Sequence, residues 1–109
     1  MLFLSVEDFL TQTGTIPRLS RDEEKALAAR MASGDRSARE VLVRSYLPQA
    51  AGFVRRAPRM IRSLRTVYAC IATVETCVDR FPFLQSSEPF AHHLARSLRH
   101  CLTECLANR

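Results

Sequence analysis

The sequence contains no tryptophan and only three glycines among its 109 residues. A chain with few glycines is not expected to form many tight turns. Its apolar residues also do not alternate with polar ones as they do in half-buried strands. These absences argue against a β-sheet fold and favour helices. Apolar residues make up 47% and charged residues 25% of the chain, ordinary globular values that argue against disorder. We expect a single domain over residues 1–109, because a chain of this length buries roughly 60–70% of its unfolded surface.

Lysine is almost absent as well, since Lys25 is the one basic residue of sixteen that is not arginine. The formal net charge is +5. Guanidinium groups suit phosphates and carboxylates, so nucleic acid and an acidic protein are both candidate partners. Charge alone leaves an alternative open, in which the arginines reflect an arginine-favouring genome and simply lie on a solvated surface.

The chain also lacks a long apolar run. Its apolar start, Met1 to Leu4, is too short to span a membrane and has no basic flank like that of a signal peptide. We therefore expect a cytoplasmic protein.

No constellation of catalytic residues is recognisable in the sequence. There is no Ser-His-Asp arrangement and no glycine-rich phosphate loop, and His92 and His93 have only Glu88 as a nearby carboxylate. We expect no enzymatic activity and no cofactor.

Four cysteines lie in the second half of the chain: Cys70, Cys77, Cys101 and Cys105. Without an export signal, reduced thiols are expected rather than disulfides. The spacings of seven and four place each pair on one helix face, where the pairs could meet as a zinc site with a nearby histidine. The spacing is not that of a Cys-x-x-Cys knuckle, and apolar neighbours favour buried core thiols. We predict no metal site.

The clearest helix start and stop signals lie between Ile16 and Ala51. Ser20 precedes a helical run that has Glu23 three residues later, the arrangement of a capping box. Gly34 suits the left-handed exit of this helix, and Asp35 can cap the next one at once. The segment therefore predicts a helical hairpin with a short turn.

Three further helices are expected around this hairpin. A short helix is predicted at Leu4 to Thr11, with Ser5 as its cap. An apolar three-four rhythm predicts a long central helix from Arg59 to Phe81. Pro48 should kink or restart the hairpin's second helix, and Pro89 suits the first turn of a last helix. The predicted fold is an all-α, compact bundle of about five helices.

These motifs also carry a resemblance. They read Leu-Ser-x-x-Glu-Glu at residues 19–24 and Ser-Gly-Asp-x-x-Ala-Arg-x-x-Leu-Val at residues 33–43, preceded by Ser5 to Leu10, Gly14, Ile16 and Pro17. From Val6 to about Arg56 this pattern resembles, without a gap, the bacterial RNA polymerase sigma factors of the housekeeping (sigma-70) family. Residues 1–56 resemble region 1.2 and the start of region 2, and residues 57–109 resemble a divergent, degenerate remainder of region 2. The resemblance implies a sigma-factor domain-2-like fold and a role in transcription initiation or its regulation.

A cluster of arginines follows the hairpin: Arg55, Arg56, Arg59, Arg62 and Arg65. No acidic residue lies within it. At 100° per residue, Arg55, Arg59 and Arg62 would share one face of a continuous helix. Such a face predicts a DNA-binding surface that contacts phosphates, and a solvated helix end is the alternative.

The resemblance implies further DNA contacts on the last helix, where sigma factors hold an unstacked promoter base on aromatic side chains. The corresponding residues here are Phe90, His93, Arg96, Arg99 and Thr103. His93 stands at a tyrosine position and Arg96 at a tryptophan position, so the implied promoter melting is weakened. The alternative for Phe90 is a core anchor.

The resemblance also implies that the central helix contacts core RNA polymerase, at the coiled coil of its largest subunit. The mostly acidic and polar run of the family is replaced here by Arg65 to Cys70, and Arg65 and Tyr68 are the predicted polymerase-binding residues. A second hypothesis follows from the reversed charge. The chain would then be a helical protein-interaction module derived from a sigma factor, which binds an acidic protein partner and no DNA.

Overall fold

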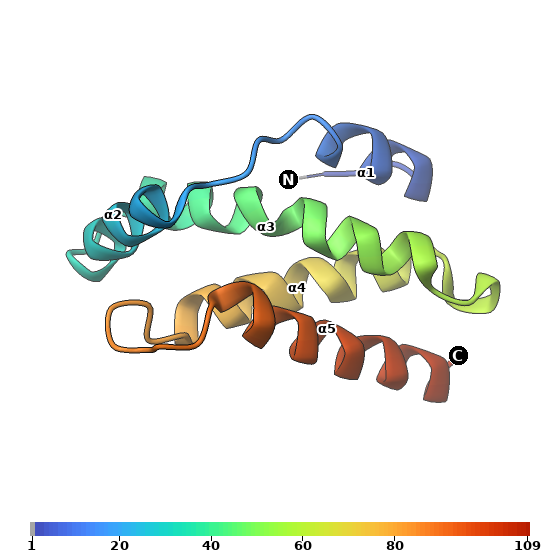
Figure 1. Ribbon diagram of the computed structural model, residues 1–109. Coiled ribbons are helices and arrows are strands. Elements are labelled where there is room, and N and C mark those ends of the chain that lie inside the picture. The colour runs from blue at the N-terminus through green and yellow to red at the C-terminus, as the bar shows by residue number, and fades with distance from the viewer. Residues whose placement is uncertain (1) are drawn as a thin grey trace.

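The helices account for most of the chain in the computed structural model, which describes residues 2–109 and leaves out Met1. They are α1 (Val6–Thr13), α2 (Arg21–Ala32), α3 (Arg36–Arg56), α4 (Leu64–Arg80) and α5 (Phe90–Ala107), with a short 3-10 helix η1 (Arg59–Ile61) between α3 and α4. Residues 2–109 contain no strand, so the all-α prediction is confirmed (Figure 1).

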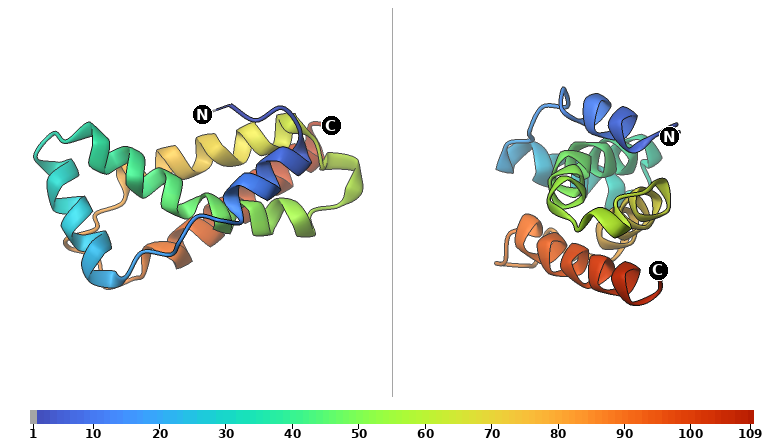
Figure 2. Two further views of the ribbon diagram at one scale, coloured as in Figure 1. Left: turned by 90° about the horizontal axis from the view of Figure 1, so that it is seen from above. Right: turned by 90° about the vertical axis from the view of Figure 1, so that its right-hand side faces the viewer.

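The long helix α3 is the central element of the bundle. It packs against α1, α2, α4 and α5, and α4 and α5 also pack against each other. The end view in Figure 2 places α1 and α5 on opposite sides of the pair formed by α3 and α4. One apolar cluster runs between them, and its completely buried members include Phe9, Leu42, Leu47, Val54, Val67, Val74, Val78, Leu94 and Leu98.

Helix α3 continues through Pro48 as one element, so of the predicted kink or restart at this residue the restart does not occur. Proline removes one backbone donor and disfavours a helix interior. Here the cost is offset by burial, because Leu47 and Ala50 on either side of the proline are both within 1% of full burial.

The predicted central helix from Arg59 to Phe81 is wrong at its N-terminal end. Ser63 has an extended backbone, and its Oγ accepts a hydrogen bond from the Thr66 amide, so that α4 begins at Leu64. The residues before this cap form η1 instead. The arginines at 59 and 62 are therefore not part of α4.

Two tyrosine hydroxyls tie distant parts of the chain together. Tyr46 on α3 donates a hydrogen bond to the Glu24 carboxylate on α2, and burial raises the pKa of this tyrosine. Tyr68 on α4 accepts a hydrogen bond from the Phe3 amide (2.7 Å) and donates one to the Phe3 carbonyl (3.0 Å). The second tie fixes the segment before α1, and helix α1 itself packs on α3.

In the part of the chain that the structure describes, no helix is long and apolar enough to cross a bilayer.

Candidate nucleic-acid and polymerase interface

Five exposed arginines border the turn between α3 and α4: Arg55, Arg56, Arg59, Arg62 and Arg65. We call them the arginine cluster. Helix α3 ends at Arg56, and Ala57 and Pro58 have extended backbone conformations. The continuous helix face on which the prediction relied therefore does not form. The cluster instead spans the end of α3, the connection with η1 and the first turn of α4, and this connection lies at one end of the bundle (Figure 1).

Two members of the arginine cluster also make contacts within the chain, one in the turn and one at the end of α3. Nη2 of Arg62 donates a hydrogen bond to the Ala57 carbonyl at 2.9 Å. The guanidinium of Arg56 lies over the Phe53 ring, 5.3 Å from its centroid. Each guanidinium carries five N–H donors, so both side chains keep donors for a ligand.

No carboxylate neutralises the arginine cluster within residues 2–109. The ion pairs there are Arg30–Asp35, Arg39–Asp79, Arg96–Glu88 and His100–Glu104, and none includes a member of the cluster. Five exposed cations without an internal counter-ion give this end of the molecule a positive potential.

Phe90, predicted to contact DNA, lies in the core. Its side chain is 1% exposed, and its ring packs against the rings of Tyr46 (4.6 Å), Phe83 (4.8 Å) and Phe81 (5.2 Å). No face of the ring is accessible to a base in this arrangement. The core-anchor alternative therefore holds, and the prediction that Phe90 contacts DNA by stacking on a base is wrong.

The other predicted residues of α5 are partly or fully exposed. His93 is half-buried, with its ring 5.1 Å from that of Phe81. Arg96 is bonded to Glu88, and this hydrogen bond lowers the pKa of the carboxyl group. Arg99 and Thr103 are exposed, and the Thr103 hydroxyl donates to the Arg99 carbonyl at 3.0 Å. Arg96 thus has an internal partner, in contrast to the arginine cluster.

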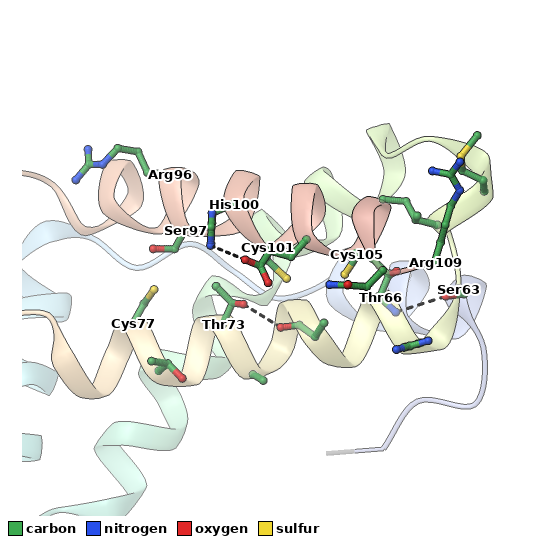
Figure 3. Close-up of a pocket in the computed structure, with 18 of the residues that line it drawn as sticks. Ser63, Thr66, Thr73, Cys77, Arg96, Ser97, His100, Cys101, Cys105 and Arg109 are labelled. Carbon is green, nitrogen blue, oxygen red and sulfur yellow. Dashed lines mark hydrogen bonds and ion pairs between the residues drawn. The ribbon is translucent and has the colours of Figure 1, made fainter.

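A groove of about 1030 Å³ separates the exposed faces of α4 and α5 (Figure 3). Its α4 wall consists largely of small residues: Ala69, Ala72, Thr73 and Thr76. Arg65 and Arg96 both line it, so the groove joins a predicted polymerase contact to a predicted DNA contact. Sequence reasoning missed this groove, although small residues at spacings of three and four along α4 were its signal.

The two predicted polymerase-binding residues do not share a surface. Arg65 lines the groove between α4 and α5, whereas Tyr68 lines a separate depression beside Phe3 and α3. The hydroxyl of Tyr68 is occupied by the Phe3 backbone. Tyr68 thus has a structural task that the sequence did not indicate.

The four cysteines are free thiols. Among the described residues, no group of three or more His, Cys, Asp or Glu side chains is arranged to hold a metal ion. The two predicted pairs do not gather into one site, because Figure 3 shows Cys77 of α4 apart from Cys101 and Cys105 of α5 along the groove.

The hairpin from α2 to α3 confirms the predicted caps. The Ser20 hydroxyl accepts from the Glu23 amide (3.1 Å), and the Glu23 carboxylate accepts from the Ser20 amide (2.9 Å). Gly34 has φ +95°, the left-handed conformation that favours glycine. Both helix boundaries thus follow from local chemistry.

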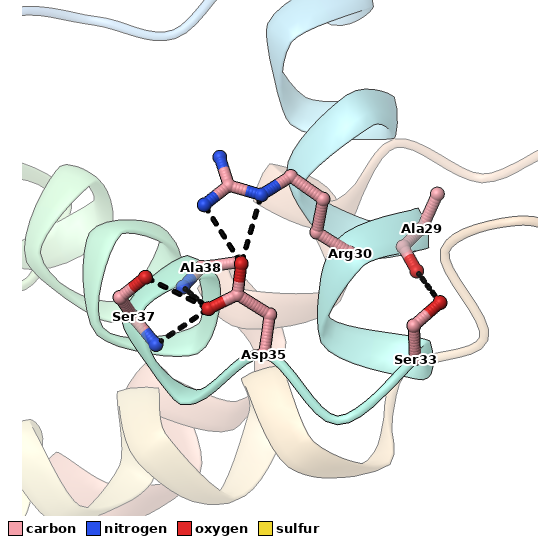
Figure 4. Close-up of polar contacts among 6 residues, drawn as sticks. All are labelled: Ala29, Arg30, Ser33, Asp35, Ser37 and Ala38. Carbon is pink, nitrogen blue, oxygen red and sulfur yellow. Dashed lines mark hydrogen bonds and ion pairs between the residues drawn. The ribbon is translucent and has the colours of Figure 1, made fainter.

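Asp35 fastens the two helices of the hairpin to each other (Figure 4). Its Oδ1 accepts hydrogen bonds from the amides of Ser37 and Ala38, and its Oδ2 accepts from Nε of Arg30 on α2 at 2.9 Å. The Ser37 hydroxyl also donates to Oδ1, at 2.7 Å, and this bond, followed by that from Arg30, lowers the pKa of Asp35 to about 2. The carboxylate thus acts as helix cap and ion-pair partner at once.

Residues 5–37 match the family model described as Sigma-70 factor, region 1.2. The matched segment contains α1, the connection to α2, all of α2 and the capped start of α3. This match supports a sigma-70-like relationship and a sigma-related function in transcription, which implies association with RNA polymerase. It covers less than a third of the chain, and the arginine cluster and the groove lie outside it. No curated protein and no solved structure matches the chain.

Proposed function

We propose that this protein is a sigma-like transcription factor that uses the arginine cluster to bind the DNA phosphate backbone while it associates with core RNA polymerase. One observation carries the proposal. A segment related to sigma region 1.2 is followed by five exposed arginines that no carboxylate neutralises within residues 2–109. Phosphate contacts of this kind hold a protein on DNA without reading its sequence.

The protein would not open promoter DNA in the manner of a housekeeping sigma factor. Base stacking needs an accessible aromatic face. Phe90 is buried, and Arg96 stands where the family carries an aromatic residue and is paired with Glu88. We therefore assign binding and positioning on DNA to this domain, with His93 and Arg99 as secondary contacts.

Polymerase binding is assigned to the exposed face of α4. The family resemblance places the coiled coil of the largest subunit against this helix. Arg65 gives the surface a positive charge, which requires an acidic contact on the polymerase. Tyr68 lies outside this face, and its hydroxyl holds the N-terminal segment instead.

DNA binding is tested by fluorescence anisotropy with labelled single- and double-stranded DNA between about 50 and 200 mM salt. In the double variant Arg55→Glu/Arg59→Glu, we expect affinity to fall roughly 10–100-fold and the slope of log K against log salt to shrink by about 2. Neither residue holds the turn.

A matched control is the double variant Arg21→Glu/Arg36→Glu. Both arginines are exposed first residues of α2 and α3, where an acidic residue suits the helix N-terminus. The change in net charge is the same, so a specific role of the arginine cluster predicts less than about a threefold effect here. Equal losses in both variants, or no salt-dependent binding at all, would contradict the proposal.

A second candidate is favoured by the groove between α4 and α5. The groove is lined by Arg65, Arg109 and Arg96, of which Arg96 is paired with Glu88, and by one carboxylate, that of Glu104. This excess of positive charge fits a protein-interaction module that binds an acidic partner and no DNA. Binding to core polymerase that persists in Arg55→Glu/Arg59→Glu but disappears in Arg65→Glu, without salt-dependent DNA binding, would favour this candidate.

A further inference from the structure

Arg56, the last residue of α3, is held in place by a neighbouring aromatic ring. Its guanidinium carbon lies over the ring of Phe53, 5.3 Å from the centroid, a position in which the ring attracts a cation. Phe53 is partly buried and packs against the apolar core, whereas Arg56 is exposed. The core thus fixes the ring, and the ring holds the guanidinium at the surface.

Gly52 leaves room for this guanidinium on the same side of α3. A methyl group at position 52 would lie 3.4 Å from Nη1 and 3.7 Å from Nη2 of Arg56. Positive φ is confined to Gly34 in the described residues, so the backbone at position 52 does not require glycine. Glycine also destabilises the interior of a helix. What glycine provides at this position is space, and the guanidinium of Arg56 lies beside that space.

Arg56 keeps all of its hydrogen-bond donors for a ligand. Its attraction to the ring face uses the positive charge of the guanidinium and none of the five N–H groups. No side-chain hydrogen bond or ion pair within residues 2–109 includes Arg56. Arg62, by contrast, uses one donor on the Ala57 carbonyl. Arg56 is thus the member of the arginine cluster that is both held in position and fully available.

We propose, on the basis of the DNA binding proposed above, that Arg56 is the main phosphate-binding residue of the arginine cluster. Phe53 and Gly52 position its guanidinium for the two non-bridging oxygens of one DNA phosphate. A planar guanidinium donates two parallel N–H groups to such a pair of oxygens. A freely rotating arginine loses rotamer freedom when it binds, whereas Arg56 has already lost part of that freedom in the folded protein. Its contact with a phosphate therefore costs less entropy.

The first test compares two substitutions that keep the positive charge, Arg56→Lys and Arg55→Lys, by fluorescence anisotropy with labelled double-stranded DNA. Lysine binds phosphate as a point charge and lacks the planar fork. We expect Arg56→Lys to weaken binding roughly three- to tenfold, the effect of ordering one long side chain. The slope of log K against log salt should stay that of wild type in both variants, because the number of cations is unchanged.

Arg55→Lys is the matched control in this comparison. Arg55 is the exposed neighbour of Arg56 at the end of α3, and no ring contact, ion pair or side-chain hydrogen bond in the described part of the chain includes it. It therefore has no prior position to lose. The affinity of this variant should change by less than about twofold.

Three further variants test how the guanidinium is held. Phe53→Leu removes the ring but keeps an apolar side chain, and Gly52→Val adds a β-branched side chain, which crowds the residue four positions along a helix. Each should weaken binding about two- to fivefold at an unchanged salt slope. Gly52→Ala is the control, because its methyl group meets Arg56 at an ordinary contact distance, and it should bind within about twofold of wild type. In an Arg56→Ala background, neither Phe53→Leu nor Gly52→Val should change the affinity further.

Proton NMR measures the ring contact without DNA. The Phe53 ring should shift the side-chain signals of Arg56 upfield in wild type, and Phe53→Leu should abolish this shift while the dispersed spectrum shows a folded protein. Equal affinities of Arg56→Lys and Arg55→Lys, or wild-type affinity of both Phe53→Leu and Gly52→Val, would overturn the role of Arg56. Salt-dependent binding by wild type would in that case still support the proposed function, whereas its absence would overturn both.

Discussion

The segment from Ser5 to Ala38 and the pair of helices α4 and α5 are stabilised by different kinds of contact. In the first, side-chain caps lie within a few residues of the amides that they satisfy, as with Ser20 and Asp35. In the second, buried apolar side chains such as Phe90 join helices that are far apart in sequence. Helix boundaries can therefore depend on single polar residues, whereas the arrangement of the bundle depends on how buried apolar side chains fill the space between the helices.

The largest effect on stability is expected from Phe90, one of the buried apolar side chains that join helices far apart in sequence. Phe90→Ala removes a ring that packs against three others, and we expect a loss of about 3–5 kcal/mol in the free energy of unfolding. Urea denaturation followed by circular dichroism measures it. Leu84→Ala is the control, since Leu84 is 55% exposed and should change stability by less than about 0.5 kcal/mol. A loss below about 1 kcal/mol would place Phe90 outside the core.

A smaller effect, of opposite sign at two positions, is expected from the glycines. Gly34→Ala should cost about 1–2 kcal/mol, because φ is +95° and no atom lies near enough to add a clash or a contact. Gly52→Ala, inside α3, should stabilise by about 0.5–1 kcal/mol, because its new Cβ meets only the flexible Arg56 side chain at 3.4 Å. Thermal unfolding measures the change in stability of both variants, and a change of the same sign in both would contradict this prediction.

The smallest effect is expected from the charge on Asp35, which belongs to the polar contacts. Its pKa is lowered from 3.8 to about 2, so the stability that it adds is complete above pH 4 and is lost as pH falls through about 2. Asp35→Asn keeps a capping oxygen but does not titrate. The urea midpoint of wild type should therefore fall more steeply than that of the variant between pH 4 and pH 2, and parallel curves would refute the assignment.

The same contrast explains which parts of the fold the sequence could predict. Ser20, Gly34 and Asp35 act on neighbouring amides or on their own backbone, so their roles follow from residue type and spacing. The start of α4 also had such a signal in Ser63, but the apolar rhythm on both sides of it favoured one longer helix. There the periodicity was a weaker guide than the cap.

The candidate site could be predicted only in part. The arginine cluster was recognisable because no acidic residue interrupts it in sequence. Its shape was not, because η1 and the bond from Arg62 to the Ala57 carbonyl interrupt the helix that the apolar rhythm predicted. The groove was missed because it needs α4 and α5 to be placed side by side, and spacing within each helix does not determine that placement.

The two tyrosine ties have a spectroscopic consequence. With no tryptophan present, near-ultraviolet emission of the folded protein originates from Tyr46 and Tyr68. One ring reports on the join between α2 and α3, and the other on the anchoring of the N-terminal segment to α4. The chain thus contains an intrinsic optical probe for each tie, and replacing either tyrosine by phenylalanine isolates the signal of the other.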